Sequence, residues 1–127
     1  MDQPIEIRNL TRGKLPSLPL AKIKEKILGK KYNLSVVFIG EHRSKKLNRK
    51  YKNKNTSTNI LSFPLSKSEG EIFITPARAY RQAKKFDKNK KQMLGYLFIH
   101  GLLHLDGMAH GSRMEEAEKK FCRIFKV

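Results

Sequence analysis

The stretch from Met93 to Leu105 constrains this chain more than any other, because nearly all of its side chains are apolar. An α-helix with apolar side chains around its whole circumference has no face to turn to water, so it must be buried among other elements. The stretch is interrupted by histidines and is too short to span a bilayer. The sequence therefore predicts a central buried helix from about Lys90 to Leu105.

Shorter segments around this helix alternate between strand and helix patterns. Segments with alternating or β-branched residues predict strands over 3–10, 33–40, 58–64 and 71–76. Amphipathic spacing predicts further helices over 18–30, 42–52, 77–86 and 113–126. A chain of 127 residues with this pattern is expected to form one domain over residues 1–127.

The connections between these segments predict the topology of the sheet. Helical crossovers make the first three strands parallel, and the short connection after Pro64 makes the fourth strand antiparallel to the third. We therefore expect an α+β fold. It should have a small mixed four-stranded sheet, with three parallel strands and one antiparallel edge, packed with about five helices.

Three histidines follow one another at a spacing that suits a metal ion. His100 and His104 are four residues apart on the predicted central helix, so both imidazoles point the same way. Gly107 can end the helix in a left-handed conformation, which lets His110 turn back toward the same ion. Three imidazoles leave the fourth position of zinc open, as in catalytic sites. The pattern predicts one Zn²⁺ on these histidines, although imidazole also suits nickel, copper and iron.

The residue beside the first histidine argues against a peptidase. Zinc peptidases with similar spacing carry a glutamate directly after the first histidine, where it acts as the base, and this chain has Gly101 there. Asp106 is either a carboxylate that orients an imidazole or simply polar surface at the helix end. A closed structural zinc site would need a fourth ligand such as Cys122, the only thiol. Cys122 is more simply a small buried residue in a reducing compartment.

The charge of the chain points to a polyanionic partner. Lys and Arg outnumber Asp and Glu by 28 to 11, for a net charge of +17. RNA, DNA or an anionic membrane would suit such a domain, and a lysine-rich proteome would also explain the charge. Segments 42–54 and 78–91 each carry seven basic residues. Their aromatic residues Tyr51, Tyr80 and Phe86 either stack on bases or point into the core. The first ten residues contain no apolar run typical of a signal peptide.

Two motifs resemble the bacterial YbeY family of single-domain, metal-dependent endoribonucleases. The family pattern H-G-x-L-H-L-x-G-x-D-H is met by HGLLHLDGMAH at 100–110, except at Ala109. The pattern Y-R-x-K-D-x-x-T-[DN]-V-L-S-F-P is approximated by YKNKNTSTNILSFP at 51–64. A third signature, G-D-I, is replaced by Gly70-Glu71-Ile72. The resemblance runs from about Ser35 to the end of the sequence.

This resemblance implies a zincin-like α+β fold with zinc on the three histidines. It also implies a cytoplasmic endoribonuclease specific for single-stranded RNA. Such an enzyme would act in 16S rRNA 3′-end maturation, ribosome biogenesis and ribosome quality control, with the small ribosomal subunit as partner and without DNA or membrane. The family arginine thought to help catalysis falls on Lys52, which keeps the charge but lacks a bidentate fork. We expect Lys52 to be catalytic, and Arg49, Lys50 and Lys54 to bind RNA.

The chain departs from the family motifs at two further positions. Two alternative functions also stay open. Ala109 and Asn55 replace family aspartates, so a carboxylate of the family site is missing. One alternative is a metal-dependent hydrolase of peptides, and the other is a non-catalytic basic ribosome-binding factor stabilised by zinc. For RNA, the nucleophile would be either its own 2′-OH or a metal-activated hydroxide, and Gly101 is compatible with both.

Overall fold

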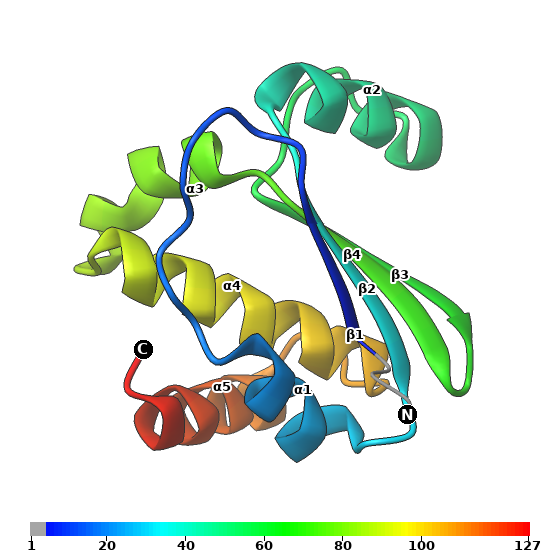
Figure 1. Ribbon diagram of the computed structural model, residues 1–127, viewed down its shortest axis with the longest axis vertical. Coiled ribbons are helices and arrows are strands. Elements are labelled where there is room, and N and C mark those ends of the chain that lie inside the picture. Colours follow the sequence, from blue (N-terminus) through cyan, green and yellow to red (C-terminus); the bar gives the residue numbers. More distant parts are fainter. Residues whose placement is uncertain (1–4) are drawn as a thin grey trace.

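The computed structural model describes residues 5–127, and every predicted element is present in that range (Figure 1). The strands are β1 (Ile5–Asn9), β2 (Asn33–Phe38), β3 (Ile60–Ser66) and β4 (Glu69–Ile74). The helices are α1 (Leu20–Leu28), α2 (Glu41–Lys52), α3 (Pro76–Ala83), the short 3₁₀ helix η1 (Lys84–Phe86), α4 (Lys90–Leu105) and α5 (Ser112–Phe125). The predicted helix over 77–86 is thus divided into α3 and η1. Residues 3 and 4 of the first predicted strand lie outside the described range.

The expected α+β fold with a mixed four-stranded sheet is confirmed, but the antiparallel strand is not the one predicted. The strand order is β1-β2-β4-β3, and β2 pairs in parallel with both β1 and β4. The strand antiparallel to the other three is β3, the third in sequence, rather than β4. The reason is that α2 does not cross a face of the sheet. It lies beyond the end of the sheet, so the chain returns along the edge and then inserts β4 beside β2 (Figure 1).

The edge position of β3 also explains why this strand passes its proline. The sequence predicted an end at Pro64, yet β3 continues to Ser66 with a shift of register between these residues. A proline lacks the N–H that a central strand must donate, and an edge strand has one side free of such bonds. The strand therefore reaches the tight turn at residues 67 and 68 that leads into β4.

The predicted central helix is confirmed as α4. Nine of its residues are buried, and α1, α3, α5 and the sheet lie around it (Figure 1). Its first turn is closed by Asn89 and Gln92, which satisfy each other's backbone N–H groups at 2.8 and 2.9 Å. Its largest fully buried side chains include Leu94, Phe98 and Leu102. Because these residues pack against other elements on several sides, the helix cannot rotate. The core packing therefore fixes the direction of its polar side chains.

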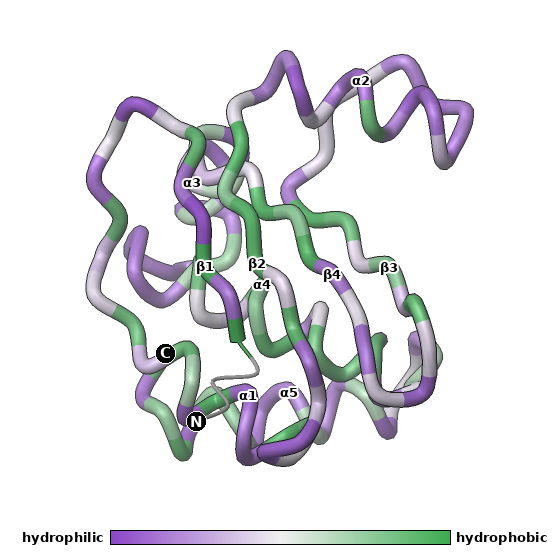
Figure 2. The backbone as a smooth tube through the Cα atoms, turned by 45° about the vertical axis from the view of Figure 1, so that its right-hand side comes forward, coloured by the Kyte–Doolittle hydropathy of each residue, from purple (hydrophilic) through white to green (hydrophobic). Residues whose placement is uncertain are grey.

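The second helix is built differently. Figure 2 shows α2 as a largely hydrophilic segment standing apart from the apolar strands. Its buried residues are polar: Ser44 and Asn48 are 0% and 4% exposed. The Ser44 hydroxyl donates to the Thr58 carbonyl and accepts from the Thr58 N–H, both at 2.9 Å, and the Asn48 amide donates to the Thr56 carbonyl at 2.9 Å. These bonds fasten α2 to the segment that enters β3.

Candidate metal centre and facing basic wall

The three predicted histidines meet at one point. On α4, His100 and His104 bring their Nε2 atoms to 3.1 Å of each other. The ring of His110 lies 4.6 Å from that of His104 and 5.4 Å from that of His100, centroid to centroid. One ligand atom from each histidine lies within 4.8 Å of the other two, as a shared metal ion requires. We call these three residues the histidine wall.

The loop after α4 carries His110 back, as predicted from the glycine. Gly107 has φ +93°, a left-handed conformation that few other residues adopt without strain. The N–H of Gly107 donates to the His104 carbonyl and that of Met108 to the Leu103 carbonyl, both at 3.0 Å. These bonds satisfy carbonyls at the helix end while the chain reverses. The reversal places His110 opposite the two helical histidines.

The donor set fits a zinc ion. Zinc holds imidazole nitrogens at about 2.0–2.1 Å, so two ligands at tetrahedral angles lie roughly 3.4 Å apart. The observed 3.1 Å between the two helical Nε2 atoms is near that value. Burial lowers the pKa of His104, and the neighbouring imidazoles of His100 and His110 lower it further. A lowered pKa keeps the imidazole neutral, which is the form that binds a metal.

A carboxylate that the sequence analysis missed supports the first histidine. Glu118, on α5, is 8% exposed and its carboxylate contacts Nδ1 of His100. This contact favours the tautomer that leaves Nε2 of His100 free for a metal. Asp106, the acid considered from the sequence, is exposed at the end of α4. The signal for Glu118 was its spacing: it lies four residues after the buried Met114, on the core face of its helix.

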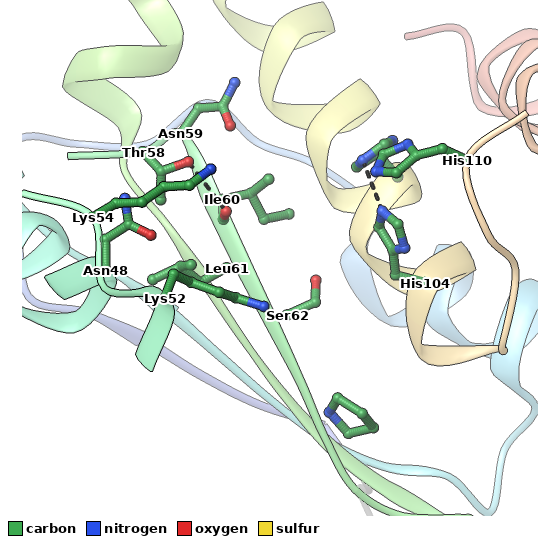
Figure 3. A pocket seen from close by; sticks show the side chains of 12 residues that line it. Asn48, Lys52, Lys54, Thr58, Asn59, Ile60, Leu61, Ser62, His104 and His110 are labelled. Atoms are coloured by element: carbon green, nitrogen blue, oxygen red, sulfur yellow. Dashed lines mark hydrogen bonds between the residues drawn. The ribbon is translucent and has the colours of Figure 1, made fainter. Parts of the chain in front are cut away.

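The histidines line one side of a cavity of about 550 Å³. Figure 3 shows Lys52 and Lys54 on the opposite side, with β3 residues such as Ile60 and Ser62 between the two sides. We call Asn48, Lys52 and Lys54 the lysine wall. The predicted catalytic lysine therefore faces the histidines.

The other two predicted RNA-binding residues lie elsewhere on α2. Arg49 and Lys50 are exposed but do not line the cavity. The ammonium of Lys50 lies 5.2 Å from the ring centroid of Tyr51. The structure thus brings Lys52 and Lys54 to the histidines and leaves Arg49 and Lys50 on the outer surface.

Asn48 sets the shape of the lysine wall, and sequence reasoning did not select it. It is buried, and its carbonyl accepts the N–H of Lys54 at 3.3 Å. Asn53 adopts a left-handed conformation with φ +55° and ends α2 between the two lysines. The buried amide and this sharp turn together direct Lys52 and Lys54 into the cavity. The available signal in the sequence was an asparagine four residues before Lys52, on the same face of the predicted helix.

The close packing of Gly101 explains why no glutamate follows the first histidine. A Cβ atom at this position would lie 2.7 Å from Cδ1 of Ile60 and 2.9 Å from Oγ of Ser62. The α4 helix therefore touches β3 through a position that holds no side chain. A glutamate would have to displace the ends of the Ile60 and Ser62 side chains. Cys122, the other ligand considered, is not part of the histidine cluster found among residues 5–127.

Comparisons with known proteins place the chain in a family. A family model described as Endoribonuclease YbeY matches residues 6–123. The chain belongs to the endoribonuclease YbeY family. The Endoribonuclease YbeY of Thermodesulfovibrio yellowstonii is 42% identical over 93 residues, which are 68% of this chain and 58% of that protein. The Endoribonuclease YbeY of Mesoplasma florum is 33% identical over 111 residues, or 79% and 63% of the two chains. Each alignment thus spans less than two thirds of the relative.

A solved structure shares the fold of this chain. The solution structure of a Thermotoga maritima protein superposes with a TM-score of 0.66 at 29% identity. The match covers 92% of this chain and 85% of the other. Within residues 5–127, no helix combines the length and apolar character that a membrane crossing requires.

Proposed function

We propose that this chain is a zinc-dependent endoribonuclease that cleaves single-stranded RNA. The observation that carries the proposal is the opposition of the two walls: three histidines face Lys52 and Lys54 across one cavity of about 550 Å³. Membership of the YbeY family and the net charge of +17 support RNA as the substrate. A polyanion gains phosphate contacts from such a surface, whereas a peptide gains little.

Within this proposal, residues 1–127 act as one catalytic domain in the cytoplasm. The biological substrate is ribosomal RNA bound to the small ribosomal subunit. The steps served are 16S rRNA 3′-end maturation, ribosome biogenesis and ribosome quality control. The names of the YbeY relatives support the nuclease activity, and the resemblance of the two sequence motifs supports the ribosomal role.

The histidine wall is assigned to one Zn²⁺ through His100, His104 and His110. When bound, zinc supplies Lewis-acid chemistry at a phosphate oxygen or lowers the pKa of a water molecule. Glu118 holds the ring of His100, so that Nδ1 donates to the carboxylate and Nε2 faces the ion. His110 is the exposed ligand, so substrate reaches the centre from the side of its loop.

The lysine wall is assigned to the phosphate. The ammonium groups of Lys52 and Lys54 oppose the negative charge that develops on phosphorus during cleavage. Lys52 is the catalytic residue in this assignment, acting as a point charge rather than a bidentate fork. Arg49 and Lys50, exposed on the same helix, bind the RNA backbone outside the cavity.

The packing of Gly101 restricts the chemistry that this cavity performs. A carboxylate side chain at this position would have to displace the side chains of Ile60 and Ser62. RNA carries its own nucleophile, the 2′-OH, and needs no such carboxylate. A 2′-OH attack leaves a 2′,3′-cyclic phosphate, whereas attack by hydroxide leaves a linear phosphate end. Analysis of the product ends therefore decides between the two routes.

The proposal is tested with three proteins purified in parallel: wild type, His104→Ala and His42→Ala. His42 is the remaining histidine and lies exposed on α2, so its variant controls for loss of an imidazole and for contaminating nucleases. Each protein is incubated at low salt with an end-labelled single-stranded RNA, with zinc or with a chelator. We expect cleavage by wild type and His42→Ala, no cleavage by His104→Ala, and arrest by the chelator.

Other outcomes select other functions. Equal cleavage by all three proteins would assign the activity to a contaminant and overturn the proposal. RNA binding without cleavage by any of them would favour a ribosome-binding factor stabilised by zinc. Cleavage of an unfolded polypeptide in a parallel assay, unaffected by added RNA, would favour the peptidase despite the packing of Gly101.

A further inference from the structure

A second hollow of about 320 Å³ lies on α4 beside the histidine wall. We call it the rear hollow. It is formed by the end of η1, the following loop, the first half of α4 and the middle of α5. Its lining residues include Phe86, Lys88, Tyr96, Glu115 and Lys119. None of these residues lines the cavity between the histidine and lysine walls.

A row of rings connects the rear hollow with the metal centre. The ring of Tyr96 lies 6.1 Å from that of His100, with 36° between the planes. The ring of Phe86 lies 6.1 Å from that of Tyr96, with 32° between the planes. Phe86 is 50% exposed, although a phenylalanine is normally buried. The row thus starts at a metal ligand and ends in an aromatic ring open to solvent.

The charges around the exposed ring suit a polyanion. Lys88 and Lys119 both line the hollow, and the ammonium of Lys88 lies 5.3 Å from the Tyr96 ring centroid. Lys84 and Lys85, on η1, are also exposed. Two acids line the hollow as well, but the carboxylate of Glu118 is already held by His100. Glu115 is thus the acid left facing a ligand.

We propose that the rear hollow is a stacking subsite for an unpaired base of the RNA substrate. The base lies on the exposed ring of Phe86, and the adjoining phosphates contact Lys88 and Lys119. This subsite rests on the proposed function, because it extends the path of the strand beyond the cleaved phosphate. Every base has a π-face, so such a platform accepts any sequence but requires a single strand. The subsite therefore gives a physical reason for preferring unpaired RNA.

The test measures binding rather than cleavage. The zinc-loaded full chain is titrated with an unstructured 2′-O-methyl oligonucleotide that contains 2-aminopurine, whose fluorescence falls when it stacks. The oligonucleotide is checked for integrity after each titration. We expect Phe86→Ala to weaken binding about 5- to 150-fold, because an aromatic platform contributes about 1–3 kcal/mol per base. Phe86→Trp should retain both the affinity and the quenching.

Matched variants separate stacking from a general loss of structure. Leu65→Ala removes another exposed apolar side chain, 61% exposed on β3, and should bind like wild type. Glu115→Gln should tighten binding, since it removes the acid that faces the ligand. A very short oligonucleotide that fills only the cavity should not distinguish Phe86→Ala from wild type. The zinc content and melting temperature of each variant confirm that the metal centre is intact.

Each outcome bears on a different proposal. If Phe86→Ala binds and quenches like wild type while zinc-dependent cleavage is present, the rear hollow is not a subsite and the proposed function stands. If Phe86→Trp is as weak as Phe86→Ala, the ring does not act by stacking and the subsite is overturned. If the wild-type chain binds no RNA at all, the proposed function falls together with the subsite.

Discussion

The two walls of the cavity are held in place by opposite means. The histidine wall stands on α4, whose neighbouring residues Ile99, Leu102 and Leu103 are at most 1% exposed. The lysine wall stands on α2, which buries two polar side chains, Ser44 and Asn48. Apolar packing holds one helix on several sides, whereas the buried contacts of the other helix are mainly a few hydrogen bonds.

This difference matches what each wall must do. Metal ligands must be held to within a fraction of an ångström, and a close-packed core supplies that precision. A flexible phosphate chain is bound by point charges, whose attraction tolerates small displacements. The histidine wall should therefore respond to changes in packing, and the lysine wall to changes in charge and hydrogen bonding.

A substitution in the lysine wall should lower the cleavage rate without changing the zinc affinity of the histidine wall. Lys52→Ala should lower the rate of RNA cleavage about 100-fold, the loss typical when one group that stabilises transition-state charge is removed. Its zinc affinity should stay at the wild-type value, since the histidine wall is untouched. Single-turnover cleavage and zinc competition with a chelator measure the two quantities. A parallel fall in zinc affinity would show that the walls are not independent.

A glycine-to-alanine substitution on each of the two helices that carry the walls should change the free energy of unfolding by different amounts. Gly101→Ala should lower the free energy of unfolding by about 1–3 kcal/mol, because the new Cβ would lie 2.7 Å from Cδ1 of Ile60 in a close-packed core. Gly40→Ala, at the N-cap of α2, meets no atom within 4 Å, so its cost should be limited to the weaker N-cap preference of alanine, about 0.5–1 kcal/mol. Denaturant unfolding of both variants in the presence of zinc makes the comparison. Equal losses would contradict the difference in packing.

A smaller effect tests the hydrogen bonds of the lysine wall. Asn48→Ala removes a 2.9 Å bond to the Thr56 carbonyl and should cost about 1–2 kcal/mol of unfolding free energy. The KM for RNA should rise because Lys52 and Lys54 lose their fixed direction. Zinc affinity should remain unchanged. Arg49→Ala, on the outside of the same helix, is the control for stability. It should leave the free energy of unfolding unchanged and raise the KM for RNA most at low salt, where its phosphate contact is least screened.

The sequence predicted correctly the features that a local pattern of side chains determines: the buried central helix and the convergence of the three histidines. The all-apolar stretch could only be a buried helix, and the spacing of His100, His104 and His110 around Gly107 could only converge if that helix ended there. Both predictions concern local geometry on a single helix. The structure confirms the helix and shows the convergence.

The failures concern relations between elements. The strand and helix pattern predicts a crossover helix over 42–52. This segment has only Leu47 and Tyr51 as apolar residues, so it lacks an apolar stripe to bury on a sheet. That deficiency was visible in the sequence and would have predicted a helix beyond the sheet. Arg49 and Lys50 lie outside the cavity, and their contact with RNA stays a prediction. Helical periodicity places Asn48, rather than these two residues, on the face of Lys52. The pairing of Glu118 with His100 required the packing of α4 against α5.

In the metal-free protein, the free energy of unfolding should depend weakly on pH through the histidine wall. Burial and the other two imidazoles lower the pKa of His104 in the folded chain, while in the unfolded chain it titrates near its ordinary value of about 6.5. Below about pH 6.5 the unfolded chain binds this proton more readily than the folded chain. The free energy of unfolding is therefore retained above about pH 6.5 and falls as the pH is lowered below it. The loss should not exceed about 1.4 kcal/mol per pH unit.

Unfolding in denaturant with a chelator, between about pH 5.5 and 7.5, checks this sign. The loss of stability on acidification should be smaller in His104→Gln, which has no imidazole to protonate. His42→Gln removes an exposed imidazole from α2 and should keep the pH dependence of the wild type. If wild type instead gains stability on acidification, the attraction of the Glu118 carboxylate for a protonated histidine outweighs the effect of burial and of the neighbouring imidazoles. The histidine wall would then be organised by an ion pair rather than by burial.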